Sequence, residues 1–269
     1  METKVVLITG GSSGIGKTIG TYLSSKGHKV YGTTRSSRKY PNFDAFPLLE
    51  MDVRSPEDIK KAIAALIAQE GRLDVLINNA GVGITGPLEE TPEEEIMNAF
   101  DTNFHGPIRV IKAVLPQMRK QGGGLVINIT SIAAYMGLPY RGVYSATKAA
   151  LEVLTEALRM ETKAFGIQIT NLAPGAFATN IAAGRYHVEI DTHSPYGIQY
   201  RNTLKGIDES VENGEDPIEV ALKVSKIINN GNPDIHYTVG AFNQKLSIFL
   251  KKYLPQKVFE KILLNHYKL

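Results

Sequence analysis

A glycine-rich turn near the start of the chain constrains the fold more than any other feature. The apolar run Val5–Ile8 leads directly into the segment Thr9–Gly16, whose glycines are spaced as GxxxGxG. A buried strand that runs into such a turn and then into a helix can present backbone N–H groups to a pyrophosphate. The sequence therefore predicts a dinucleotide-binding unit, in which the phosphates lie against Gly10, Ser12, Ser13, Gly14, Ile15 and Gly16.

Short apolar runs alternate with longer amphipathic segments along most of the chain. The predicted strands are Val5–Ile8, Lys29–Thr33, Phe46–Glu50, Val75–Asn78, Leu125–Thr130, Ile167–Ala173 and His236–Val239. Helices are expected between them, among them Ile15–Lys26, Pro56–Glu70 and Val143–Phe165. This alternation predicts an α/β protein with a doubly wound Rossmann fold, a seven-stranded, mostly parallel sheet and helices on both faces. A chain of 269 residues is expected to form a single domain, residues 1–269.

The composition argues against several classes of protein. Because the chain has no cysteine, it has neither disulfides nor thiolate metal sites, and this is typical of a reducing compartment. Its six histidines show no HExxH-like spacing, so no metal site is predicted, and a net charge of +3 is too small to indicate nucleic-acid binding. We find no apolar stretch as long as a membrane span and no signal peptide before the first strand. We therefore expect a cytoplasmic protein.

Two segments depart from the alternating pattern. Residues 177–215 lack periodicity and are rich in tyrosine and histidine, and a long insertion of this kind before a helix is often an active-site lid. Residues 241–269 form a basic amphipathic tail, in which Glu260 is the one acidic residue among six lysines: Lys245, Lys251, Lys252, Lys257, Lys261 and Lys268.

The tail has three interpretations. It could lie on an anionic membrane surface, cap the pocket or a subunit contact, or pack on its own domain with the lysines in solvent. Because Pro255 interrupts the segment, we expect two short helices rather than one.

Tyr144 and Lys148 are four residues apart in a segment predicted to be helical. This spacing places the phenol and the ammonium on one face of the helix, where the lysine charge stabilises the phenolate. A phosphate cradle beside an activated phenol is what hydride transfer to or from a carbonyl group requires.

The end of the second predicted strand favours NADP(H) over NAD(H). An NAD site usually has a carboxylate there that accepts from the ribose 2′-OH, but this chain has no Asp or Glu between Gly27 and Phe43. Arg35 stands there instead, and a guanidinium can bind a 2′-phosphate through paired hydrogen bonds. Arg38 and Lys39, which follow, are expected to lie in solvent.

Further motifs follow the predicted strands in a fixed order. They are Asp52-Val53, Asn78-Asn79-Ala80-Gly81, Asn103, Ser131, the Tyr144/Lys148 pair, and Pro174-Gly175 with Thr179. Together with the TGxxxGxG turn, this series resembles the short-chain dehydrogenase/reductase family, from Thr9 to about Thr179.

The resemblance implies a role for each catalytic candidate. Tyr144 would be the general acid in reduction or the base in oxidation. Lys148 would stabilise the phenolate and hold the nicotinamide ribose, and Ser131 would hydrogen-bond the substrate oxygen and orient it. Asn103 would kink its helix and help to hold a water that relays protons to Lys148. The cofactor would contact Asp52 and Val53 at the adenine, Asn79, Ala80 and Gly81 along the adenosine, and Pro174, Gly175 and Thr179 at the carboxamide.

Within the family, the segments Lys29–Arg35, Gly83–Leu88 and Met136–Tyr144 are similar to the branch that contains 17-beta-hydroxysteroid dehydrogenase type 1 and retinol-type reductases. That similarity implies an apolar carbonyl or alcohol substrate, steroid-like or lipid-like. It also implies a homodimer or homotetramer formed through the helices that carry Asn103 and Tyr144.

Two other functions share these motifs. A 3-oxoacyl-thioester reductase would need a basic patch for its acyl carrier, and the acidic run 208–216 counts against it. A catalytically silent NADP(H)-binding protein is the other alternative, and the intact set Ser131, Tyr144 and Lys148 counts against that one.

Overall fold

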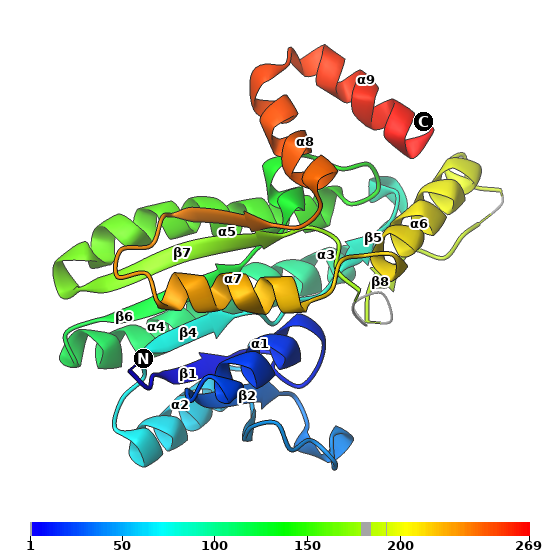
Figure 1. Ribbon diagram of the computed structural model, residues 1–269. Coiled ribbons are helices and arrows are strands. Elements are labelled where there is room, and N and C mark those ends of the chain that lie inside the picture. Colours follow the sequence, from blue (N-terminus) through cyan, green and yellow to red (C-terminus); the bar gives the residue numbers. More distant parts are fainter. Residues whose placement is uncertain (1, 179–183, 192) are drawn as a thin grey trace.

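The computed structural model describes residues 2–178, 184–191 and 193–269. Within these residues the centre is a parallel seven-stranded sheet in the order β3-β2-β1-β4-β6-β7-β9 (Figure 1). The strands are β1 Val5–Ile8, β2 Lys29–Thr34, β3 Leu48–Glu50, β4 Val75–Asn78, β6 Gly124–Ile129, β7 Ile167–Pro174 and β9 His236–Val239. The strand order changes direction between β1 and β4, the kind of switch point at which doubly wound sheets bind ligands. The predicted Rossmann fold is confirmed.

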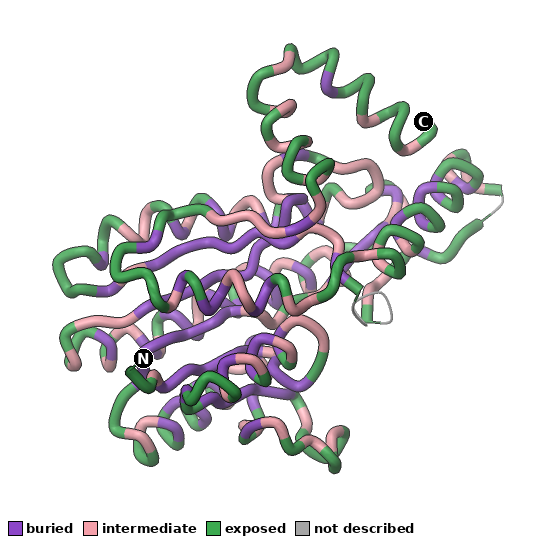
Figure 2. The backbone as a smooth tube through the Cα atoms, viewed as in Figure 1, coloured by how far each residue is buried: buried purple, intermediate pink, exposed green. Residues whose placement is uncertain are grey.

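Helices cover both faces of the sheet, and the buried strands lie between them (Figure 2). On one face lie α1 Gly14–Ser25 and α7 Ile218–Ile228, which pack on Val6 and Ile8. On the other lie α2 Pro56–Glu70, α4 Gly106–Lys120 and α5 Gly142–Thr162, with Val5 and Leu7 beneath α2 and α4. The short helix α3 Glu93–Phe100 precedes α4. Successive residues of a strand point to opposite faces, so one apolar run serves both layers.

The boundaries of two predicted elements change by more than one residue. β3 begins at Leu48 rather than Phe46, because the Phe46 ring packs against α1, so close that a Cβ at Gly20 would lie 2.3 Å from it. The α-helical part of α5 ends at Thr162, and the remainder of the predicted segment is a 3-10 turn. The short turns are η1 Ser37–Lys39, η2 Leu88–Glu90, η3 Asp101–His105, η4 Ile132–Tyr135 and η5 Lys163–Phe165.

The described part of the insertion is more regular than its sequence indicates. It forms strand β8 Tyr186–His187, which pairs with β5 Ile84–Thr85, and the helix α6 Gly197–Glu212. The interpretation of this segment as non-periodic is therefore wrong for α6. The helix buries only a narrow stripe against a small cluster that contains Tyr200 and Leu204, so its apolar period is weak in the sequence. The roles of the insertion as a lid and of residues 1–269 as one domain stay predictions.

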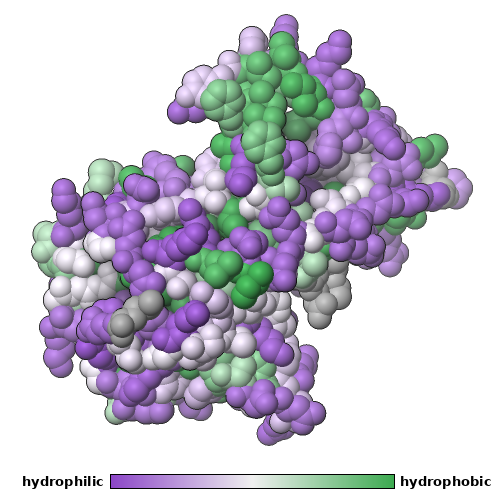
Figure 3. Space-filling view, in the orientation of Figure 1, coloured by the Kyte–Doolittle hydropathy of each residue, from purple (hydrophilic) through white to green (hydrophobic). Residues whose placement is uncertain are grey.

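The tail forms two helices, α8 Phe242–Tyr253 and α9 Gln256–Tyr267, which meet at Pro255 as predicted. Phe259 is 3% exposed and packs with Ile132 and Met136. Apolar side chains also gather on the outside of the tail helices in Figure 3, and Phe242, Phe249 and Tyr253 are the most exposed of them. In the described residues no helix combines the length and the apolar character needed to span a bilayer.

Candidate active site

The glycine turn lies at the switch point of the sheet, between β1 and α1. Gly10 and Gly14 have φ of 64° and 51°, in the left-handed region that favours glycine. A Cβ at Gly16 would lie 2.4 Å from the carbonyl oxygen of Gly10, so only glycine fits where the turn enters the helix. Ser12 is buried, and Ser13 is the N-cap of α1 without a side-chain cap hydrogen bond. The free N–H groups at this helix start can hold an anion.

The segment after β4 holds the turn in place. The Asn79 side-chain amide donates to the carbonyl oxygens of Thr9 and Gly10 at 3.0 and 3.1 Å. In return, the Thr9 hydroxyl accepts from the backbone N–H groups of Asn79 and Ala80. Asn79, which was predicted to line the adenosine, therefore uses its side chain to fix the cradle.

Arg35 and Asp52 lie at the same edge, after β2 and β3. Arg35 is exposed, and its charge is among those that lower the pKa of Asp52. The larger cause of that lowering is the hydrogen bond from Arg54, which forms a 2.7 Å ion pair with Asp52. Val53 is buried beneath Gly106, so only its backbone could reach a cofactor. A small cavity of about 300 Å³ extends from Arg35 to Arg185 of the insertion.

Asn103 lies in the π-helical turn η3 between α3 and α4, which confirms that its helix departs from regular winding there. Its side chain is fully buried and satisfied: Oδ1 accepts from the N–H of Val82 at 2.8 Å, and Nδ2 donates to the Val82 carbonyl at 2.9 Å. Nδ2 also donates to the hydroxyl of Thr147 on α5. Asn103 thus ties the segment after β4 to the helix that carries Tyr144 and Lys148. π-Helical turns often mark functional sites.

Tyr144 and Lys148 are both buried on one side of α5, with 9% and 5% exposure. The Lys148 ammonium donates to the carbonyl oxygen of Ile129 at 3.0 Å. A Cβ at Gly81 would lie 3.4 Å from this ammonium and 3.1 Å from Asn103, so the glycine leaves room for the three groups to meet. Burial lowers the pKa of Lys148, while the charges of Tyr144 and Glu152 act in the opposite direction.

Ser131 follows β6 and is the N-cap of η4, where its hydroxyl accepts from the N–H of Ala133 at 3.1 Å. Ala133 and Tyr144 belong to one apolar cluster, so the turn that carries Ser131 packs against the predicted acid. Among the described residues no acceptor is recorded for the proton of this hydroxyl. The structure therefore brings together Asn103, Ser131, Tyr144 and Lys148 as predicted.

The predicted nicotinamide end lies where β7 ends, at Pro174 and Gly175. The Gln244 side chain of α8 approaches so closely that a Cβ at Gly175 would overlap it, and the same amide oxygen accepts from the N–H of Ala176. The tail thus reaches the cofactor edge, a contact that the sequence did not indicate. Thr179 lies outside the described residues.

A buried carboxylate behind the site was also missed. Glu152, one turn beyond Lys148 on α5, accepts from the hydroxyl of Thr130, the residue before Ser131, and from the Asn171 amide. It also pairs with His236 on β9 at 2.7 Å and accepts from the Tyr135 hydroxyl at 3.4 Å. Glu152 therefore links the strands β6, β7 and β9 behind Ser131 and Lys148. The spacing of 144, 148 and 152 was the available signal, because residues four apart share a helix face.

The remaining unpredicted groups surround Tyr144 itself. The Arg141 guanidinium lies 5.2 Å from the centroid of the Tyr144 ring. Arg141 also interacts with the hydroxyl of Tyr267 at the end of α9. A separate groove over α6 contains none of the predicted catalytic residues; its walls are Ile190, Arg201, Leu204, Lys205, Asp208, Glu209 and Glu212.

Comparison with known proteins agrees with this geometry. The short chain dehydrogenase family model matches residues 4–189. A 3-ketodihydrosphingosine reductase of Bacteroides thetaiotaomicron is 39% identical over 261 residues, 97% of this chain and 96% of that protein. Estradiol 17-beta-dehydrogenase 1 of Rattus norvegicus is 32% identical over 260 residues, 88% of this chain and 74% of that protein.

Solved structures resemble the chain over nearly all of its length. A short-chain dehydrogenase from Streptomyces avermitilis has a TM-score of 0.81 at 32% identity, covering 100% of this chain and 97% of that one. ElxO with NADP bound has a TM-score of 0.71 at 27% identity, covering 88% and 97%. With the cradle, the Tyr144/Lys148 pair and Ser131 in one site, the chain belongs to the short-chain dehydrogenase family.

Proposed function

We propose that this oxidoreductase uses NADP(H) to transfer a hydride between the nicotinamide and a carbonyl or secondary alcohol of an apolar, lipid-like substrate. The observation that carries the proposal is the buried group of Tyr144, Lys148 and Asn103 beside Ser131, at the ligand edge of the sheet. The relative of 39% identity, a 3-ketodihydrosphingosine reductase, supports a long-chain ketone as the substrate class.

The cofactor edge fits NADP(H). Gly16 lets the start of α1 pack directly on the Gly10 carbonyl and the Asn79 amide, which keeps the turn in the shape of an anion cradle. Arg35 supplies a cation where β2 ends, and no carboxylate follows it until Asp44. A cation favours the 2′-phosphate, whereas NAD sites have an acidic residue there. The NADP-bound structure of ElxO, a related chain, supports the same assignment.

The side chains of the site can each take a separate role in proton transfer to the substrate. Bound NADPH would supply the hydride. We assign to the Ser131 hydroxyl a hydrogen bond to the substrate carbonyl oxygen, and to Tyr144 the proton that this oxygen receives. The Lys148 ammonium, held by the Ile129 carbonyl, stabilises the phenolate that remains. Asn103 keeps the Val82 segment and α5 in register, so its role here is that of a positioning residue.

The environment of Ser131 supports an apolar substrate. Ile132, which follows it, packs with Met136 and with Phe259 of the tail. Further apolar side chains surround this group: Leu138, which follows η4, and Leu250, Leu254 and Leu263 of the tail. A wall of this kind favours a hydrocarbon chain over a sugar or an amino acid, because it offers no hydrogen-bond partners.

The test is NADPH consumption, and separately NADH consumption, with long-chain ketones, steroid ketones, retinal and an acetoacetyl thioester. We expect turnover of an apolar ketone with NADPH. The variant Arg35→Glu should reverse much of the preference for NADPH, by about 10- to 100-fold, because it replaces charge-assisted hydrogen bonds with repulsion. Lys39→Glu, a charge change on the neighbouring turn, is the matched control. Tight NADPH binding without turnover of any ketone would instead favour a silent binding protein.

We further propose two assemblies. A homodimer or homotetramer would cover the outer face of α5, where Val153 and Met160 are 66% and 73% exposed. Light scattering on wild-type protein and on Met160→Lys tests this, and a wild-type monomer would refute it.

Peripheral contact of the tail with an anionic membrane would use Phe249, Tyr253 and the lysines beside them. Flotation with phosphatidylglycerol vesicles should recover the protein, and Phe249→Ser should weaken its recovery.

A further inference from the structure

Glu152 on α5 is a buried carboxylate that the proposed chemistry does not use. Its side chain is only 7% exposed. In the described part of the chain, side chains from several elements lie within hydrogen-bonding distance of its two oxygens: the hydroxyls of Thr130 and Tyr135, the Asn171 amide and the His236 ring. An ionised carboxylate only accepts hydrogen bonds, so it suits a buried position on which donors converge.

Two of these donors lie at the two ends of the turn that carries Ser131. Thr130 is the residue before Ser131, and its hydroxyl donates to one oxygen of Glu152. Tyr135 is the last residue of η4, and its hydroxyl donates to the other oxygen at 3.4 Å, the longer of the two contacts. The carboxylate therefore holds the turn from both ends, and Ser131 lies within a segment that is tied to α5.

The same face of α5 carries the predicted catalytic pair. Lys148 is one turn before Glu152, and its ammonium donates to the carbonyl of Ile129, the last residue of β6, at 3.0 Å. The two side chains therefore bind successive residues, Ile129 and Thr130, directly before Ser131. Because residues four apart share a helix face, these contacts fix the register between α5 and the end of the strand. That register sets where the serine hydroxyl lies relative to the predicted acid on the same helix.

Asn171 and His236 hold the carboxylate from the side of the sheet. Asn171 of β7 is fully buried, and its amide donates to a side-chain oxygen of Glu152 at 2.9 Å and to its backbone oxygen at 3.2 Å. His236 of β9 has one ring nitrogen 2.7 Å from Glu152 and the other 3.0 Å from Glu156, one turn further along α5. A rotation of Glu152 would leave buried donors unpaired, so the position of its carboxylate is well defined.

We propose that Glu152 is a positioning residue for Ser131, because it holds both ends of the turn and so sets the serine hydroxyl where it can orient the substrate carbonyl. The inference rests on the proposed function and adds a residue that acts through Ser131 rather than on the reacting atoms. A misplacement of about 1 Å at a catalytic group can cost about 10²-fold in rate. We expect a smaller loss for Glu152→Gln, about 10- to 30-fold in kcat, because glutamine keeps the size and one acceptor oxygen of the side chain.

The test is a double-mutant cycle with Ser131→Ala, measured with NADPH and the ketone of the panel above that wild-type protein reduces fastest. Glu152→Gln should lower kcat by about 10- to 30-fold and leave KM within about threefold. In the Ser131→Ala background the same change should cost less than about threefold, since the hydroxyl that it misplaces is absent. Thr130→Val removes the hydroxyl that donates to Glu152 and keeps the branched shape, so it should reproduce the loss. It also carries the test if Glu152→Gln does not fold.

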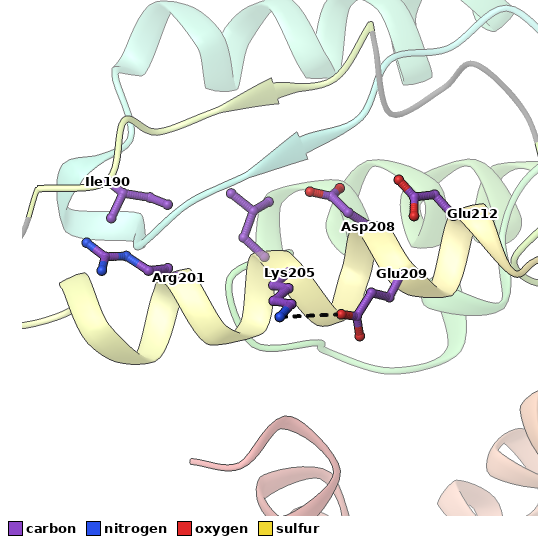
Figure 4. Close-up of a pocket in the computed structure, with 7 residues that line it drawn as sticks. Ile190, Arg201, Lys205, Asp208, Glu209 and Glu212 are labelled. Carbon is purple, nitrogen blue, oxygen red and sulfur yellow. Dashed lines mark ion pairs between the residues drawn. The ribbon is translucent and has the colours of Figure 1, made fainter.

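Glu156→Gln is the matched control. It changes a carboxylate of the same helix that pairs with the same histidine, and His236 rather than the turn of Ser131 is its recorded partner. A second control is Glu209→Gln on α6, a carboxylate that pairs with Lys205 in the groove of Figure 4. Both variants should keep kcat within about twofold of the wild-type value, because surface ion pairs contribute little.

Two kinetic results would overturn the inference. One is an unchanged kcat in Glu152→Gln. The other is an equal loss with and without the Ser131 hydroxyl, since Glu152 would then act independently of the serine.

If wild-type protein reduces no ketone, the proposed function fails first, and amide hydrogen exchange judges the inference instead. The N–H groups of Ala133 and Ala134 donate to the side chain and to the backbone carbonyl of Ser131, so they report directly on its turn. They should exchange at least about tenfold faster in Glu152→Gln than in Glu156→Gln. Equal exchange rates in the two variants would refute the inference.

Discussion

In the cofactor half of the site two side chains hold the backbone of two short segments in place. In the substrate half the contacts run between side chains from several elements. Thr9, Asn79 and Gly16 build the cradle within two neighbouring strand ends. The substrate half joins η4, α8 and α9 through Phe259 and its partners. Backbone cradles bind a group common to many enzymes, and side-chain walls can change without disturbing them.

The strongest test of this division is Tyr144→Phe, which removes one hydroxyl from the substrate half. We expect kcat to fall by about 10²- to 10⁴-fold, because positioned acid–base transfer contributes that much. The NADPH dissociation constant, measured by fluorescence titration, should stay the same. Tyr196→Phe, a change at a half-buried tyrosine whose hydroxyl donates to Glu89, is the control. Full turnover in Tyr144→Phe would mean that another group donates the proton.

Gly16→Val should weaken cofactor binding by distorting the glycine turn. The new Cβ would lie 2.4 Å from the Gly10 carbonyl oxygen and 2.5 Å from the Asn79 amide, so the turn must shift. We expect the NADPH dissociation constant to rise by about 100-fold, together with a loss of stability of about 1–3 kcal/mol in urea unfolding. Gly206→Val, in α6 with open space around it, is the matched control. Unchanged NADPH binding in Gly16→Val would place the pyrophosphate elsewhere.

Phe259→Ala should affect the substrate half alone. It removes a buried ring from the cluster with Ile132 and Met136, so the turn after Ser131 loses its support. We expect KM for an apolar ketone to rise by about tenfold and the melting temperature to fall, with NADPH affinity unchanged. Val258→Ala, at a half-exposed neighbour on α9, controls for changes in the helix itself. If NADPH affinity fell instead, the two halves would not be independent.

Asp52→Asn should have the smallest effect, and a pH-dependent one. Arg54 lowers the pKa of Asp52 in the folded protein below its ordinary value of 3.8. The stabilisation from this carboxylate is therefore present above that value and disappears as the pH falls through the folded pKa. Urea unfolding should show Asp52→Asn less stable than wild type at pH 7, by up to about 1 kcal/mol, and this difference should shrink as the pH is lowered below 3.8. A difference that stays constant over this range would contradict this account.

The same division explains what the sequence could predict. The strands, the cradle and the Tyr144/Lys148 pair were accessible because each depends on local spacing, whereas Asn103 and Ser131 were accessible through the resemblance to the family. The contacts of Gln244 with Gly175, of Arg141 with Tyr267 and of Arg185 with Asp208 were not accessible, since each joins residues from different segments of the chain. Helix α6 was not predicted from the sequence, because its buried side chains pack in a small separate cluster rather than in the main core.

The π-helical turn at Asp101–His105 has a consequence for how this chain can vary. A π turn accommodates one residue more than an α turn. Deleting a single residue there would restore regular winding and rotate one side of the helix by about 100° relative to the other. Asn103 would leave Val82 and Thr147, although no residue of the pocket had been substituted. In this stretch, the number of residues is under stronger constraint than the identity of most of them.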